Sequence, residues 1–101
     1  MSQIRLRDWE RTGVVALFSR SDGGVSRGPY ATLNVGLHVG DDASDVLTNR
    51  ARLAAEAGLS ERRIAYAEQV HGSGVGLVAS ADAGRGSQSL DGALPGVDAL
   101  V

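Results

Sequence analysis

The sequence predicts an α+β fold, because it combines one well-capped helix with several short apolar segments of strand type. The helix is expected over residues 43–57. The apolar segments are too short for stable helices, and turns rich in glycine separate them. A chain of 101 residues has room for one small domain. We therefore expect a single domain over residues 1–101 with a modest core.

The composition argues against several classes of protein. Ten arginines, with no lysine, oppose 12 carboxylates and give a net charge of −2, so no basic surface predicts nucleic-acid binding. The absence of cysteine excludes a disulfide, a thiolate nucleophile and a cysteine-based zinc site within these residues. No apolar stretch reaches the roughly 18 residues that a membrane span needs. We expect a cytoplasmic protein with neither a membrane nor a nucleic acid as partner.

A buried strand is expected at residues 14–18, which form a continuous apolar run rich in strand formers. The strand leads into an irregular loop over residues 19–30, where glycine, serine and proline gather. Arg20 opens this loop and is a candidate contact for a phosphate or carboxylate, because a guanidinium group forks onto such anions. The loop is not a P-loop, because no Gly-Lys-Ser/Thr follows the glycines. An ordinary surface turn is the alternative for a Gly-Gly loop with a flanking arginine.

A second strand is expected at residues 33–39, where apolar residues alternate with small or polar ones. Asn34 and His38 then share the more polar face of this strand. A strand histidine beside glycines is more often structural than a ligand, so His38 is left out of the metal set.

The helix is expected to begin at Ala43, with the Asp42 carboxylate as its N-cap. Gly58 is expected to end it in the left-handed conformation, with Leu59 folding back as the apolar partner of that cap. Asn49 and its polar neighbours are expected to lie away from the buried face. The face expected to pack on the sheet comprises Val46, Leu47, Leu53, Ala54 and Ala57.

The last third of the chain predicts a hairpin or bulged corner, followed by a long loop. Strands are expected at residues 64–67 and 74–78. Residues 79–96 lose periodicity, and within them the segment Ala-Gly-Arg-Gly-Ser-Gln-Ser, residues 83–89, predicts an exposed, mobile loop. Residues 97–101 begin a new apolar run, and a strand that stops there suggests a truncated domain.

The segment Gln69-Val70-His71-Gly72 places one imidazole after a strand. Gly72 lets the backbone turn sharply, so the ring of His71 can point away from the sheet edge toward a metal or a substrate. A surface histidine is the alternative for this motif taken alone.

Several blocks of the chain, taken in order, carry a family resemblance. They are residues 19–34, Gly40-Asp41-Asp42, Asn49-Arg50, Gln69-Val70-His71-Gly72 and Asp98-Ala99-Leu100-Val101. Together they resemble the YfiH or laccase-domain family of purine nucleoside phosphorylases, over essentially the whole chain. The resemblance implies the N-terminal portion of a YfiH-like mixed β-sandwich with outer helices, in α/β/β/α layers, the remainder of the domain being absent from this chain.

The resemblance also implies a zinc-dependent enzyme that phosphorolyses adenosine, inosine, guanosine and methylthioadenosine, with adenosine deaminase activity in addition. Its partners would be a nucleoside and phosphate. His71 would be catalytic and one of three zinc ligands, the others being a Cys and a His that this chain lacks. Arg20 would contact the anion, and Asn34 and Gln69 the nucleoside hydroxyls or base edges, because amides both donate and accept. Holding the loops together is an equally good role for the two amides.

Other functions stay open beside this one. The chain is alternatively a non-catalytic stub or a partner-binding module, and a peptidoglycan-editing hydrolase is a further alternative. A copper oxidase is disfavoured, because such sites need several histidines and a soft sulfur ligand. Half of a sandwich leaves sheet edges and an apolar face uncovered, so the fragment alone is expected to be unstable or to associate.

Overall fold

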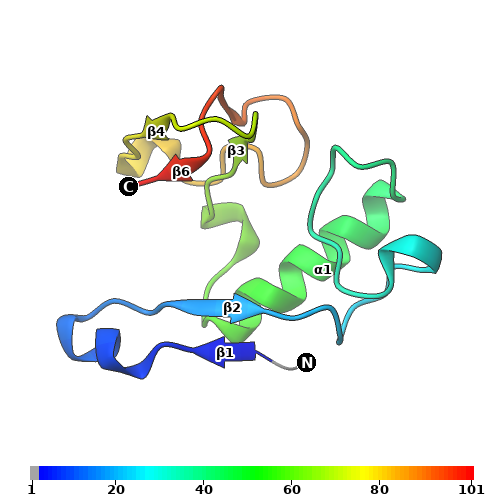
Figure 1. Ribbon diagram of the computed structural model, residues 1–101, viewed down its shortest axis with the longest axis horizontal. Helices are drawn as coiled ribbons and strands as arrows, with labels where there is room; N and C mark the ends of the chain where they lie inside the picture. The colour runs from blue at the N-terminus through cyan, green and yellow to red at the C-terminus, as the bar shows by residue number, and fades with distance from the viewer. Residues whose placement is uncertain (1–2) are drawn as a thin grey trace. The chain divides into compact units, whose positions relative to one another are not determined.

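The computed structural model describes residues 3–101, which fall into two compact units that meet in sequence between Gly58 and Leu59. No helix among the described residues is long and apolar enough to cross a membrane. The elements of the first unit, shown in Figure 1, are β1 (Gln3–Arg5), the 3₁₀ helix η1 (Arg7–Thr12), β2 (Leu17–Ser19), the 3₁₀ helix η2 (Gly28–Tyr30) and α1 (Ala43–Glu56).

β1 and β2 form a two-stranded antiparallel ribbon in which Ile4 lies opposite Phe18. The expected strand at residues 14–18 is therefore shorter and shifted, and the expectation that it is buried is wrong, since Phe18 is 62% exposed. A ribbon of two strands has only one neighbour per strand and shields little apolar surface. The apolar run thus predicted a strand correctly but not its burial.

The ends of α1 confirm the predicted caps. The Asp42 carboxylate accepts the backbone amides of Ser44 and Asp45, at 2.9 and 3.4 Å, and α1 begins at the next residue. Gly58 follows the helix with φ +75°, which is the left-handed stop. Leu59 is 56% exposed, and its role as the apolar partner of the cap stays a prediction.

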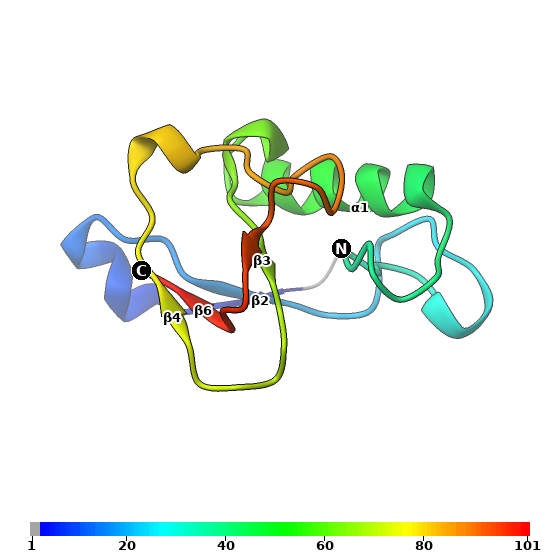
Figure 2. The same ribbon diagram turned by 90° about the horizontal axis from the view of Figure 1, so that it is seen from above.

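The buried stripe of α1 consists of Val46, Asn49, Arg50 and Ala54. Residues 21–42 lie beside the first turns of the helix in both views (Figure 1, Figure 2). The last turn of the helix contacts β1 through a 3.2 Å hydrogen bond from Gln3 to Glu56. Asn49 was expected to point elsewhere, and that expectation is wrong.

Residues 33–39 contain turns, a bend and irregular backbone but no strand, so the predicted half-buried strand is wrong. The reason lies in the partners of this backbone. The carbonyls of Thr32 and Asn34 accept from the Asn49 amide, at 3.1 and 2.8 Å, and the Val35 carbonyl accepts from Arg50 at 2.8 Å. Side chains of α1 satisfy these groups in place of a neighbouring strand.

The second unit contains two parallel strand pairs. β3 (Ala67–Glu68) pairs with β5 (Leu94–Pro95), and β4 (Val75–Gly76) pairs with β6 (Ala99–Leu100). Of the two predicted arrangements, a hairpin or a bulged corner, the hairpin is therefore wrong, whereas the strand predicted within residues 97–101 is confirmed. The elements are the 3₁₀ helix η3 (Glu61–Arg63), β3 (Ala67–Glu68), β4 (Val75–Gly76), the 3₁₀ helix η4 (Ser80–Asp82), β5 (Leu94–Pro95) and β6 (Ala99–Leu100).

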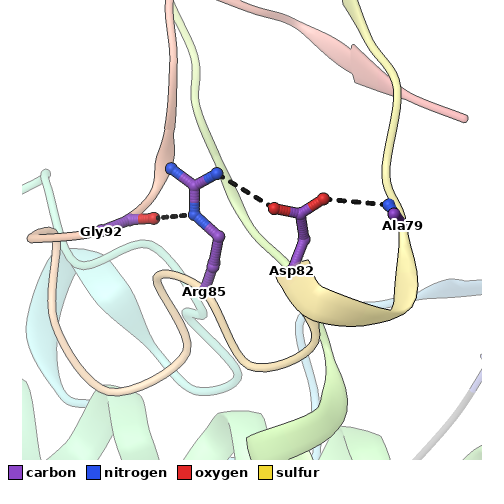
Figure 3. Close-up of polar contacts among 4 residues, drawn as sticks. All are labelled: Ala79, Asp82, Arg85 and Gly92. Carbon is purple, nitrogen blue, oxygen red and sulfur yellow. Dashed lines mark hydrogen bonds and ion pairs between the residues drawn. The ribbon is translucent and has the colours of Figure 1, made fainter.

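The segment 79–96 contains several side-chain hydrogen bonds and buried residues, in contrast to an exposed loop. Asp82 accepts the Ala79 amide at 2.9 Å and the Arg85 guanidinium at 3.1 Å, and Arg85 also donates to the Gly92 carbonyl at 2.8 Å (Figure 3). Ser87 is buried. The prediction of an exposed loop at residues 83–89 is therefore wrong for its centre, where Gly86 and Ser87 are buried, and holds for Gln88 and Ser89, which are exposed.

Candidate functional site

The turn between β3 and β4, residues 69–73, carries His71 and is called the His71 turn below. His71 has φ +58°, a left-handed conformation that is uncommon for a residue with a side chain. The amides of Val70 and His71 both donate to Oδ1 of Asp98, at 2.9 and 2.6 Å, and the amide of Gly72 donates to Oδ2 at 2.8 Å. One carboxylate thus binds three consecutive amides of the turn.

The charge of Asp98 suits this arrangement. Partial burial raises the pKa of Asp98 and is the largest single effect on it. The hydrogen bonds from the Gly72, His71 and Val70 amides and the charge of His71 act in the opposite direction, and together they leave the pKa below its ordinary value of 3.8. The carboxylate is therefore ionised at neutral pH, which strengthens its bonds to the three amides.

The side chains of Gln69 and His71 are exposed in this turn. Within residues 3–101 neither forms a hydrogen bond, so the imidazole nitrogens of His71 are open to a ligand. A neutral imidazole is a common zinc donor, and His71 fits that role as a single ligand. No group of three or more His, Cys, Asp or Glu side chains within that range could hold a metal.

The first unit contains a hollow of about 340 Å³ beside the loop that follows β2. Across it, the Tyr30 hydroxyl donates to the Val39 carbonyl at 2.7 Å and so holds two of its walls together. The hollow is lined by Ser21, Pro29, Tyr30, Ala31, Leu33, Asn34 and Val39.

Asn34 and Arg20, two of the predicted substrate contacts, lie at or next to this hollow. They differ in how many hydrogen bonds their side chains already form within the chain. Asn34 lines it, but its amide nitrogen donates to the Gly36 carbonyl at 3.3 Å and to Asp41 at 3.1 Å, and its oxygen accepts the Gly36 amide at 3.1 Å. Arg20 directly precedes the lining residue Ser21 and is exposed, with no hydrogen bond or ion pair from its side chain to the described part of the chain.

Asn49 connects the walls of the hollow to α1, a supporting role that was not predicted from the sequence. Its side chain is fully buried. Its oxygen accepts the Val25 amide at 2.8 Å, and its nitrogen donates to the Ser26 hydroxyl at 2.8 Å as well as to the two carbonyls described above. Asn49 lies three residues after Val46 and four before Leu53, so helical spacing alone places it on the buried stripe.

Asp41 extends this polar network. The Ser26 hydroxyl donates to Asp41 at 2.5 Å and is the largest influence on its pKa, which it lowers. Burial and the Asp42 charge raise that pKa, whereas the hydrogen bonds from Asn34 and the Asp42 amide lower it. The resulting pKa of Asp41 lies below its ordinary value of 3.8. An ionised Asp41 thereby fixes both Ser26 and Asn34.

Comparison with known proteins gives consistent matches. Residues 15–101 match the family model described as multi-copper polyphenol oxidoreductase laccase. The chain is 44% identical to the purine nucleoside phosphorylase YlmD of Geobacillus stearothermophilus, over 97% of this chain and 38% of that protein. It is 34% identical to the YlmD of Bacillus subtilis over 98% of this chain and 37% of that protein.

A solved structure extends the match to the fold. The crystal structure of the hypothetical protein YfiH from Bacillus licheniformis superimposes with a TM-score of 0.91 at 31% identity, covering 98% of this chain and 36% of that one. This chain therefore spans less than two fifths of the length of the relatives it matches, and the α+β fold predicted from the sequence is that of the corresponding part of YfiH.

Proposed function

Since this chain belongs to the multi-copper polyphenol oxidoreductase laccase family, also called the YfiH or laccase-domain family, we propose that it forms part of a purine nucleoside phosphorylase in which His71 is a zinc ligand. The names of the curated relatives support the activity. The single observation that carries the proposal is the His71 turn, which presents an exposed imidazole without a hydrogen bond in the described chain, on a backbone that Asp98 holds.

The proposed reaction is phosphorolysis of a purine nucleoside. A phosphate oxygen attacks the anomeric carbon of the ribose while the bond from that carbon to the purine nitrogen breaks. Adenosine, inosine, guanosine and methylthioadenosine are the proposed substrates, and deamination of adenosine is a proposed additional activity. Zinc, when bound, would supply Lewis acidity and positive charge.

Three residues of this chain have proposed roles in binding the substrates. Arg20 binds phosphate through its guanidinium group, which is free for a bidentate contact. Gln69 offers an amide in the same turn as His71 and can bond to a nucleoside hydroxyl or base edge. Asn34 has one acceptor lone pair left after its bonds within the loop, so its proposed contact with substrate is limited to accepting one hydrogen bond.

The experiment is phosphorolysis of inosine by the natural-length protein, with zinc content measured on the same samples. We expect hypoxanthine to form only when phosphate is present, and His71→Ala to lose both bound zinc and turnover. His38→Ala is the matched control, because His38 is also exposed, was not assigned as a ligand, and should retain both. Full zinc content in His71→Ala would contradict the proposed ligand role.

A second candidate, copper-dependent oxidation of polyphenols, is favoured by the description of the matching family model. This chain contributes two histidines and no cysteine, a small share of the ligands that copper oxidases use. Dye oxidation by copper-loaded protein, together with no phosphorolysis by zinc-loaded protein, would favour this candidate over the phosphorylase. If neither assay gives turnover, a non-catalytic role is supported.

A further inference from the structure

Asp98 lies against the His71 turn although it is 27 residues from His71 in sequence. Strand pairing brings the two together, because β3 pairs with β5 and β4 pairs with β6 in parallel. The connection between β3 and β4 therefore runs beside the shorter connection between β5 and β6, which contains Asp98 (Figure 2). The Asp98 amide also donates to the Gly74 carbonyl at 2.9 Å, so backbone bonding fixes Asp98 beside the turn.

The geometry of the turn calls for an acceptor at this position. Three successive amides that point to one side need a backbone of alternating conformation, and His71 supplies its left-handed member with φ +58°. The conformation is unfavourable for histidine by itself, because its Cβ crowds the backbone. The three hydrogen bonds to Asp98, all between 2.6 and 2.9 Å, offset that cost.

We propose that Asp98 is a positioning residue for the metal ligand, holding His71 in its left-handed conformation through the backbone and so setting the direction of the imidazole. This inference rests on the proposed function, since it assumes that His71 ligates zinc. A ligating histidine is ordinarily oriented by a hydrogen bond to its second ring nitrogen. In the His71 turn, Asp98 orients the imidazole indirectly, because its carboxylate binds three backbone amides and not a ring nitrogen.

The test uses the natural-length protein and compares wild type with Asp98→Asn. The amide group of asparagine keeps one oxygen but turns an N–H donor toward the turn, so at least one of the three backbone amides loses its acceptor. We expect zinc to bind about ten- to a hundredfold more weakly in competition with a chromophoric chelator, which is the usual effect of removing a group that orients a ligand. We also expect the visible spectrum of the cobalt(II)-loaded variant to change.

Asp82→Asn is the matched control. Asp82 is in the same unit and also accepts a backbone amide, but its partners are Ala79 and Arg85 and not the His71 turn. We expect its zinc affinity and cobalt spectrum to equal those of wild type. Wild-type zinc affinity in Asp98→Asn, with zinc lost in His71→Ala, overturns this inference alone. Zinc retained in His71→Ala overturns the proposed function, and with it this inference.

A second measurement applies whether or not Asp98→Asn folds. In the wild-type protein, hydrogen exchange at the amides of residues 70–72 reports directly on their bonds to Asp98. We expect these three amides to exchange more slowly than the amide of Ser73, despite their exposed side chains. Fast exchange at all three overturns the inference.

Discussion

Arg20 and Asn34 were both predicted to contact substrate, but the two side chains differ in how much of their hydrogen-bonding capacity the fold leaves free. The fold engages both groups of the Asn34 amide in bonds to Gly36 and Asp41, which favours a role in holding the loop. It leaves the Arg20 side chain exposed next to the lining of the hollow. Both remain predicted contacts, but Arg20 has more of its bonding capacity available.

Replacing Arg20 by alanine tests its role as the phosphate contact. Because a hydrogen bond to a charged group contributes about 1.5–3 kcal/mol, we expect the KM for phosphate to rise about tenfold or more, with the KM for inosine unchanged. Initial rates at varied phosphate concentration measure this. Arg11→Ala is the control, since Arg11 is an exposed arginine of η1. An unchanged KM for phosphate in Arg20→Ala would remove Arg20 from the site.

Asn49→Ala tests the buried network of the first unit. The substitution leaves the Val25 amide and the Asn34 carbonyl without their partner, and it removes one of the two donors to the Thr32 carbonyl, which keeps its bond from the Ser26 amide. We therefore expect the free energy of unfolding to fall by about 3 kcal/mol. Urea denaturation measures the loss. Thr48→Ala, at an exposed position of the same helix, should change stability by about 0.5 kcal/mol at most. Equal losses in the two variants would show that the Asn49 bonds contribute little.

At the level of elements, the cap of α1 predicts a dependence of stability on pH. The Ser44 hydroxyl is the largest influence on the pKa of Asp42 and lowers it, as do the Ser44 and Asp45 amides, while burial raises it; the net pKa lies below 3.8. A group with a lowered folded-state pKa stabilises the protein above its unfolded pKa, and this contribution disappears as the pH falls through the folded pKa. We therefore expect stability to decrease as the pH drops below about 4.

Asp42→Asn isolates the contribution of this cap. Asparagine caps a helix about as well as aspartate but does not titrate in this range, so the variant should lose less stability on acidification than wild type. Denaturation at a series of pH values from 7 to 3 makes the comparison. Identical pH profiles for the two proteins would assign the acid sensitivity to other carboxylates, of which Asp41, Asp82 and Asp98 also have lowered pKa values.

Gly58→Val tests the left-handed end of α1. A Cβ at Gly58 would meet no atom within 4 Å, so the cost comes from the backbone at φ +75° and not from a clash. We expect a loss of about 1–2 kcal/mol in the free energy of unfolding. Gly58→Asn should cost less, because asparagine adopts this conformation more readily. A valine variant as stable as the asparagine variant would contradict the explanation.

On the scale of the whole molecule, the buried apolar core of the described residues is small. It consists of Leu33, Val46, Ala54, Ala93 and Leu94, whereas Leu77 and Val101 are 83% and 76% exposed. We expect the 101-residue chain, expressed by itself, to be unstable or to associate through such surfaces. Light scattering during gel filtration measures the mass, with natural-length protein as the reference. A monomer that unfolds cooperatively would contradict this prediction.

The sequence alone determined the features that depend on neighbours a few residues apart. The caps at Asp42 and Gly58 are of this kind, because the cap bonds and the left-handed turn involve only adjacent residues. The ordered motifs likewise indicated the family, which the family model confirms, and singled out the segment that carries His71.

The tertiary structure decided the features whose partners lie far apart in sequence. The Asn49 amide bonds to carbonyls 15 and 17 residues away, and Asp98 bonds to amides 26 to 28 residues away. The alternation of apolar and polar residues over 33–39 cannot reveal that side chains of a helix, and not a neighbouring strand, bond to the backbone carbonyls of this segment. A run of three amides cannot show which carboxylate they bind, because backbone groups are alike in every residue and only the folded chain selects their partners.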